Sequence, residues 1–471
     1  MTSLSDNLKI DMDIRTVTSA SKNVRKNVVR VTREKSKQDE IFRSEDGSQT
    51  IMLGVAEPEK MTRRKLILLA RRIISIAKGK KMDTLLIDVD VFSFENVNMF
   101  DQEMGELVAT NFLMANYSFT EFLTKPEGGF PSVKEIFFEH ASKEFMEGVK
   151  RGVIIGEEVN ACRQLANLPG GDVTPETLAI EAKKIAKQHN LKVKILGVAE
   201  MKKLSMGGVL GVGKGSDIPP KFIILEYMNG KKSDASVVLV GKGVTFDTGG
   251  INLKPENSML GMNMDMSGGA AVMHAMAAIA RLKVKCNLVA LVPAVENMPS
   301  GSSYRPGDVL RSMSGKTIEV NNTDAEGRII LADALTYAAK YQPSLVVDVA
   351  TLTGAAMAAL GERASALFTA DEKLEKEFRE LGELSGDYVW PLPLWEEYDD
   401  EIKGTIGDWS NLGKTRYGGA ITAAAFLKQF AIGYPWVHLD IAPRMTSIDG
   451  EFLAKGAAGA PVRLLVKLLE R

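Results

Sequence analysis

The sequence predicts an α/β protein with two domains, a smaller N-terminal α/β domain and a C-terminal α/β/α domain with a central mixed sheet. The chain has 471 residues, roughly three times the commonest domain size of about 100 to 150 residues, so more than one packed core is expected. Hydrophobic residues make up 45% and charged residues 25%, which is the ordinary balance of a globular protein. In the second half, short β-branched segments alternate with alanine-rich helical segments, a pattern typical of a sheet covered by helices on both faces.

The N-terminal domain is predicted to span residues 1–143. Residues 22–37 contain seven Lys or Arg and one Glu, with valines between them, which indicates a strand with a solvated basic face. Residues 62–78 carry apolar side chains at helical spacing, and residues 84–89 read as a strand. These two segments predict one βα layer.

A long helix is predicted to connect the domains over residues 144–170. The helical pattern runs from Phe137 to Leu165, contains glycines at 148, 152 and 156, and stops at the sequence NLPGGD. Thr174 and Pro175 then supply a capping residue and a first-turn proline for another helix. We therefore expect the domain hinge in the long helix.

The C-terminal domain is predicted to span residues 171–471 and contains strand candidates separated by helical segments. They are 222–227, 236–241, 287–293, 345–350 and 436–442. Ligands of open α/β sheets bind just beyond the carboxyl ends of the strands, so the residues that follow these segments are candidates for a site.

Charge and cysteine content exclude some classes of function. Lys and Arg number 59 against 60 Asp and Glu, so the whole molecule has no field that would hold it on nucleic acid or anionic lipid. Two isolated cysteines, Cys162 and Cys286, cannot build a disulfide framework or a cysteine zinc site. The N-terminus lacks the pattern of an export signal, and the longest central apolar stretch, 270–280, is far shorter than the roughly 20 residues that cross a bilayer. We expect a cytoplasmic protein that does not enter membranes.

Charged side chains gather after the strand candidates. Four carboxylates and two lysines lie there within glycine-rich sequence: Lys242, Asp247, Lys254, Asp265, Asp324 and Glu326. Carboxylates at this density repel one another unless they are protonated, paired or bridged by cations, and two divalent ions would balance four negative charges. A two-metal site activates water for attack on a carbonyl or phosphoryl group, so the cluster predicts hydrolysis.

Other chemistries have fewer suitable residues. Only His274 of the four histidines lies near the carboxylates in the sequence, so a Ser-His-Asp triad or a histidine-rich zinc site is poorly supplied. Any one of the acidic residues alone could be a loop cap or a surface ion pair. Two functional alternatives stay open: nucleic-acid binding through residues 22–37, which is disfavoured because no aromatic residue interleaves with the charges, and phosphoester hydrolysis at the two-metal site.

Four motifs carry a resemblance to a known family. They are GKGVTFDTGGINLKP, MNMDMSGGAA, ENMPSGSSYRPGD and NTDAEGR. In these motifs the sequence resembles the leucyl aminopeptidase (cytosol aminopeptidase) family of dinuclear metallopeptidases, from about Gly148 to the C-terminus. The resemblance implies a hydrolase whose catalytic domain is residues 171–471, which releases leucine or another bulky apolar residue from the N-terminus of peptides. It also implies a homohexamer with two divalent ions, Zn or Mn, in each subunit.

The resemblance assigns a role to each matching residue. It implies that the metal ligands are Lys242, Asp247, Asp265, Asp324 and Glu326. It implies that Lys254 stabilises the oxyanion and that Arg328 holds a bicarbonate-like anion that relays a proton. The residues implied to line the side-chain pocket or hold the peptide backbone are Met262, Asn322, Thr351, Leu352, Gly354, Ala442 and Met445. Asn263 departs from the family pattern, in which a basic residue is usual, and we expect this to affect specificity and not the metal ligands.

Overall fold

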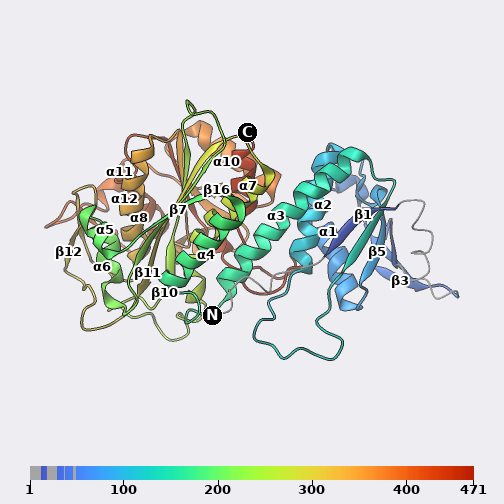
Figure 1. The fold of residues 1–471 in the computed structure, drawn as a ribbon, viewed down its shortest axis with the longest axis horizontal. Coiled ribbons are helices and arrows are strands. Elements are labelled where there is room, and N and C mark those ends of the chain that lie inside the picture. The colour runs from blue at the N-terminus through green and yellow to red at the C-terminus, as the bar shows by residue number, and fades with distance from the viewer. Residues whose placement is uncertain (1–11, 18–28, 37, 46–48) are drawn as a thin grey trace. The chain divides into compact units, whose positions relative to one another are not determined.

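The computed structural model describes residues 12–17, 29–36, 38–45 and 49–471 (Figure 1). It divides into two compact units. One contains residues 161–446 and 457–471, and the other contains the described residues up to 160 together with residues 447–456. The division at residue 160 falls inside the long helix, whereas the assignment of residues 447–456 to the N-terminal unit had no counterpart in the sequence prediction.

The described residues of the N-terminal unit form a six-stranded sheet with the order β1-β6-β5-β2-β4-β3. Its strands are parallel except β3, which is antiparallel to β4. The strand bounds are β1 Asp13–Thr16, β2 Val29–Glu34, β3 Glu40–Arg43, β4 Gln49–Gly54, β5 Thr84–Asp88 and β6 Glu135–Glu139. Helices α1 (Arg63–Gly79) and α2 (Asp101–Asn116) pack together in this unit (Figure 1), and α1 buries an apolar face that includes Leu66 and Ile73.

The basic segment 22–37 is described only in part. Residues 22–28 and 37 lie outside the described residues, and the remainder contains β2, an interior strand of the sheet. Arg30 forms an ion pair with Glu139 (2.8 Å), and the guanidinium of Arg33 lies 4.1 Å from the ring centroid of Phe94. Both described arginines therefore have partners within their own unit.

The glycines of the long helix α3 (Lys143–Asn167) allow close packing against α2. A Cβ atom at Gly148 would lie 1.9 Å from the carbonyl oxygen of Gln102, and one at Gly152 would lie 2.4 Å from that of Glu106. Since real Cβ atoms do not approach a backbone oxygen so closely, only glycine permits this contact between the two helices.

The C-terminal unit, whose residues are all described from 161 onward, contains a nine-stranded mixed sheet. Its order is β16-β15-β18-β14-β9-β11-β8-β7, with β10 paired to β11. The bounds are β7 Lys192–Leu196, β8 Lys221–Met228, β9 Val237–Gly241, β10 Gly243–Asp247, β11 Asn287–Asn297, β14 Leu345–Ala350, β15 Ser365–Phe368, β16 Val389–Pro391 and β18 Trp436–Asp440. The sequence-predicted strands correspond to β8, β9, β11, β14 and β18, and the predicted α/β class is confirmed.

Two groups of helices pack against this sheet (Figure 1). One comprises α4 (Pro175–His189), α7 (Ser267–Leu282), α10 (Glu372–Ser385) and α13 (Val462–Leu469); the other comprises α6 (Gly207–Val212), α8 (Glu326–Ala338), α9 (Gly354–Leu360) and α12 (Gly419–Lys428). The short helices α5 (Val198–Lys203) and α11 (Glu397–Asp400) and a small sheet of β12 (Val309–Arg311), β13 (Thr317–Glu319) and β17 (Trp409–Ser410) complete the unit. Helix α4 begins after Thr174, as predicted, with a reciprocal capping box.

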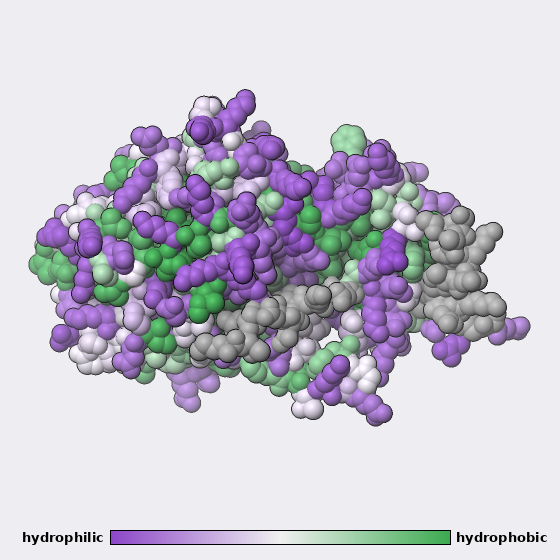
Figure 2. Space-filling model, viewed as in Figure 1, coloured by the Kyte–Doolittle hydropathy of each residue, from purple (hydrophilic) through white to green (hydrophobic). Residues whose placement is uncertain are grey.

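The hydropathy of the helices and of the surface can be compared with what a membrane-spanning segment needs. Among the described residues, no helix combines the length and apolar character needed to cross a bilayer. Hydrophilic residues are scattered over the visible face of both units in Figure 2.

Candidate metal centre

The strand ends bring the predicted residues together. Strands β9, β10, β11, β14 and β18 are mutually parallel, so their carboxyl ends lie at one edge of the sheet. Lys242 follows β9 directly, Asp247 is the last residue of β10, and Glu326 is the first residue of α8. Asp265 lies in the 3-10 helix η5 (Met262–Met266) that leads into α7. Separate elements therefore place these side chains in one site.

Three buried carboxylates form the centre of the site. One oxygen atom from each of Asp247, Asp265 and Glu326 lies within 4.8 Å of the others. The Nζ atom of Lys242 is 2.8 Å from Asp265 Oδ2 and 2.8 Å from Glu326 Oε1, and it also donates to the Thr351 carbonyl. This oxygen-rich set, together with one amine, is chemically suited to bind divalent cations.

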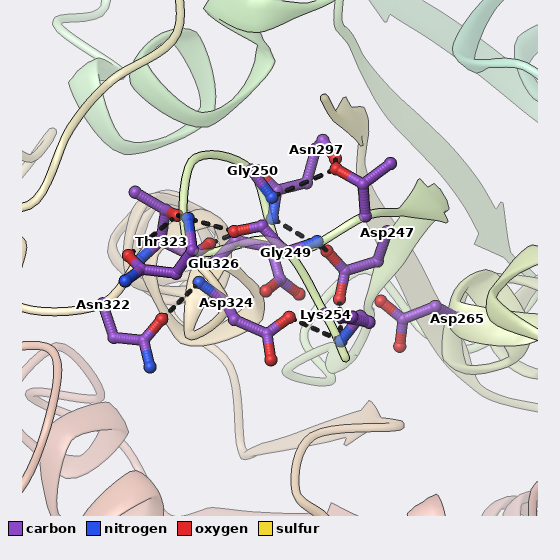
Figure 3. A network of polar contacts seen from close by, with 12 residues as sticks. Asp247, Gly249, Gly250, Lys254, Asp265, Asn297, Asn322, Thr323, Asp324 and Glu326 are labelled. Carbon is purple, nitrogen blue, oxygen red and sulfur yellow. Dashed lines mark hydrogen bonds and ion pairs between the residues drawn. The ribbon is translucent and has the colours of Figure 1, made fainter. Parts of the chain in front are cut away.

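Lys254 occupies the other side of the cluster. Its Nζ atom lies 2.7 Å from Asp247 Oδ2 and 2.5 Å from Asp324 Oδ1. Figure 3 shows the carboxylates of Asp247, Asp265 and Asp324 pointing toward a common space beside Lys254. Asp324 is more exposed than the three central carboxylates, with 32% of its side chain accessible.

A glycine turn returns the chain to the site after β10. Gly249 has a φ of 88°, and a Cβ atom there would lie 2.4 Å from the Asn252 carbonyl oxygen. The Gly249 N–H donates to Asp247 Oδ1, and the Lys254 N–H donates to the Thr248 carbonyl. The turn therefore fixes the spacing that lets Lys254 reach the carboxylate of Asp247.

Asn297 is a polar residue of the site that the sequence prediction missed. It is completely buried at the end of β11, and its Nδ2 atom donates to Asp247 Oδ1 (2.8 Å) and to the Thr323 carbonyl (3.0 Å). These bonds orient Asp247 and leave its Oδ2 atom facing Lys254 (Figure 3). The predicted strand ended at 293, so Asn297 was not recognised as a residue at a strand end.

The proximity of the carboxylates changes their proton affinities. Burial, reinforced by the neighbouring carboxylates and opposed by the lysines, raises the pKa of Asp265 to about 8 and that of Asp247 to about 6. Burial also disfavours the Lys242 ammonium, but Asp265 and Glu326 outweigh this effect and raise its pKa above the ordinary value. For Glu326, Lys242 overcomes the effect of burial and lowers the pKa. The cluster thus needs cationic charge close to its oxygen atoms.

Arg328 is buried in the first turn of α8, where the charges of Glu326 and Asp440 act on it. Its Nε and Nη1 atoms have no hydrogen-bond acceptor among the described residues, and no ion pair to it occurs there. Burial lowers the pKa of its guanidinium to about 10, so it keeps its charge near neutral pH. A buried guanidinium with unused donors is suited to a small anion.

The remaining predicted residues follow strands at the same sheet edge or lie beside the carboxylates. Thr351, Leu352 and Gly354 follow β14, and Ala442 and Met445 follow β18. The Thr351 hydroxyl contacts Asp265 Oδ1 (2.7 Å) and so supports one of the central carboxylates.

The other two predicted pocket residues belong to the segments that carry Asp265 and Asp324. Met262 opens η5 and is partly exposed. Asn322 accepts a hydrogen bond from the Asp324 N–H (2.7 Å). Asn263, the departure from the family pattern, donates to the carbonyls of Ala166 and Leu168 and so fixes η5 to the chain at the end of α3.

Comparison with known proteins agrees with this site. Residues 160–466 match the family profile described as cytosol aminopeptidase family, catalytic domain. The chain belongs to the cytosol aminopeptidase family. It is therefore a metallo-aminopeptidase, a hydrolase that uses divalent metal.

Several members of the family are close relatives. A probable cytosol aminopeptidase of Azoarcus sp. (strain BH72) is 49% identical over 345 residues, which cover 73% of this chain and 68% of the relative. One of Burkholderia mallei (strain SAVP1) is 47% identical over 356 residues, covering 75% and 70%. The fold is similar to that of the bottromycin maturation enzyme BotP in complex with Mn, with a TM-score of 0.85, 32% identity, and coverage of 94% of this chain and 99% of that one.

Proposed function

We propose that this aminopeptidase removes leucine or another bulky apolar residue from the N-terminus of peptides, by attack of a water activated at a dinuclear metal site. The observation that carries the proposal is the convergence of three buried carboxylates with Lys242 at the sheet edge. Family membership supplies the class of reaction.

The donor set fits two divalent ions. The ligands would be Lys242, Asp247, Asp265, Asp324 and Glu326, whose four carboxylates balance two dications. Such ions would lower the pKa of a bound water and polarise the scissile carbonyl. We favour Zn or Mn because a lysine amine is foreign to Mg²⁺ chemistry, and the similar structure of BotP contains Mn. Lys242 would have to bind as a neutral amine, so metal binding would release its proton.

Two cations of the chain would act without binding metal. Burial opposes the charge of Lys254, but Asp247 outweighs it and raises the pKa of Lys254 above the ordinary value. Lys254 would therefore stay protonated and stabilise the negative oxygen of the tetrahedral intermediate. Arg328 would hold a bicarbonate-like anion through its unused Nε and Nη1 donors, and that anion would relay the proton.

The substrate side chain would lie against uncharged side chains of the segments after the strands. Met262, Leu352, Ala442 and Met445 are all partly exposed and present apolar surface. Asn322, Thr351 and Gly354 would complete the pocket or hold the peptide backbone. We further propose a cytoplasmic homohexamer that acts on peptides and not on membranes or nucleic acids.

Metal replacement combined with a substrate panel tests the proposal. Chelator-treated protein should not cleave leucyl p-nitroanilide, and Mn or Zn should restore cleavage with two ions bound per chain. Leucyl and methionyl substrates should be cleaved faster than aspartyl and lysyl ones. Full activity in metal-free protein would refute the metal mechanism, and faster cleavage of an acidic residue would refute the apolar pocket.

A further inference from the structure

Asp440, the last residue of β18, lies between two loops of the site. Its side chain is completely buried. Oδ1 accepts hydrogen bonds from the N–H groups of Leu352 (3.0 Å) and Ala442 (3.1 Å), and Oδ2 accepts one from the Thr353 hydroxyl (2.7 Å). One carboxylate therefore binds the loop after β14 and the loop after β18.

The sheet register gives Asp440 this reach. Strands β14 and β18 are parallel neighbours, with Ala350 opposite Asp440, and the Ile441 N–H donates to the Ala350 carbonyl (2.8 Å). In the described part of the chain no basic side chain forms a direct ion pair with Asp440, but its charge favours the protonated forms of the buried Arg328 and His438. The direct hydrogen bonds to its carboxylate come from N–H and O–H donors of the two loops, and such charge-assisted hydrogen bonds are stronger than neutral ones.

Thr353 extends the effect of Asp440 to helix α9. Its hydroxyl has one proton, which it donates to Asp440, and its oxygen accepts the Ala356 N–H (3.0 Å) as the helix N-cap. Asp440 therefore fixes the side-chain orientation with which Thr353 starts the helix at Gly354.

We propose that Asp440 is a positioning residue that sets the spacing between these two loops and thereby governs selection among N-terminal residues. The inference rests on the proposed function, in which Leu352 and Gly354 on one loop and Ala442 on the other bound the substrate pocket. None of the hydrogen bonds of Asp440 goes to Asp247, Asp265 or Glu326. Its effect on selection should therefore be separable from metal binding.

The test compares Asp440→Asn, Thr353→Val and Thr353→Ser at matched metal content. The measured quantity is the ratio of kcat/KM for leucyl p-nitroanilide to that for alanyl p-nitroanilide. Asp440→Asn removes the charge that strengthens the hydrogen bonds to both loops, and Thr353→Val removes both the hydrogen bond to Asp440 and the N-cap of α9. Each variant should therefore lower this ratio about tenfold, mainly through KM. Thr353→Ser keeps the hydroxyl and should retain the ratio within about twofold. Bound metal should equal that of the wild type in all three variants.

Asp333→Asn is the matched control. Asp333 is also completely buried and accepts main-chain N–H groups from Val209 (2.9 Å) and Met313 (2.7 Å), but it bonds to neither pocket loop. This variant should lower Tm and leave the ratio unchanged. The Thr353 pair keeps the proposal testable if Asp440→Asn does not fold.

The remaining outcomes distinguish failure of the proposed function from failure of the positioning role of Asp440. An unchanged ratio in Asp440→Asn or Thr353→Val, with only a lower Tm, would overturn the positioning role, as would loss of metal from Asp440→Asn. A metal-loaded wild type inactive on every aminoacyl substrate would overturn the proposed function, and the pocket role with it. An active wild type whose ratio is insensitive to Asp440 would refute the role of Asp440 alone.

Discussion

The two units place acidic residues at the carboxyl edge of parallel strands in different ways. In the N-terminal unit, Asp88 at the end of β5 pairs with His140 (2.9 Å), and Glu139 at the end of β6 pairs with Arg30 (2.8 Å). In the C-terminal unit, two of the three buried carboxylates pair with Lys242, and the third, Asp247, pairs with Lys254. A position at a strand end is common to both units. What distinguishes the candidate metal centre is that its carboxylates are buried and that its lysines each balance the charge of more than one carboxylate.

Asp265→Asn should break the buried cluster and have the largest effect. It removes one charge and one ligand oxygen from the three-carboxylate set. Activity on leucyl p-nitroanilide should fall more than about a thousandfold, because metal charge supplies several kcal/mol of transition-state stabilisation. Elemental analysis should show reduced bound metal. Wild-type metal content and rate would show that Asp265 is not a ligand.

Lys254→Ala should separate charge stabilisation from metal binding. Since Lys254 would act only on the oxyanion of the intermediate, kcat and kcat/KM should fall together, by about 3 to 4 kcal/mol if it resembles loss of one oxyanion-hole donor. Metal content should remain intact. A rise in KM at constant kcat would instead assign Lys254 to substrate binding.

Arg328→Ala should have a smaller effect and a distinct signature. The variant should lose any stimulation by added bicarbonate but keep measurable turnover, since water can replace the relay less efficiently. The loss should not exceed about a hundredfold, the lower end of what proton transfer contributes. Assays of wild type and variant with and without bicarbonate decide the matter, because a response that survives in Arg328→Ala contradicts the anion-holding role.

Asp88→Asn should have the smallest effect and sharpen the contrast between the units. Its partner His140 is largely exposed, and partly exposed pairs contribute little. The free energy of unfolding should change by less than about 0.5 kcal/mol, with metal content and kcat unaltered. A loss of activity comparable to that of Asp265→Asn would show that strand-end acids matter regardless of burial.

The sequence could predict what depends on local pattern and on charge density. Lys242, Asp247, Asp265 and Glu326 were found because charged side chains are conspicuous after apolar strands, and the five strand candidates all lie on strands of the sheet. Their grouping around two ions came from charge counting, and their individual roles came from the family resemblance.

The sequence did not predict the site residues that are uncharged or that lie within strands, and the reasons are physical. Asn297 carries no charge and lies beyond the predicted strand end, and Asp440 lies inside a segment that reads as a buried strand. Their importance depends on hydrogen bonds across neighbouring strands, which single-sequence periodicity does not encode. Strand β10 was hidden because its five residues, Gly243–Asp247, lie within the glycine-rich charged motif.

Residues 447–456 determine how the two units could be expressed as separate fragments. The chain leaves the C-terminal unit just after Thr446 and re-enters it at Ala457, where Thr446 and Ala457 form a β-bridge. A single cut at residue 160 would therefore leave the C-terminal fragment carrying ten residues whose packing belongs to the other fragment. Replacing residues 447–456 with a short turn would keep Thr446 and Ala457 paired in their β-bridge. Independent expression of the C-terminal unit thus requires two edits to the chain, one at the helix and one at the bridge.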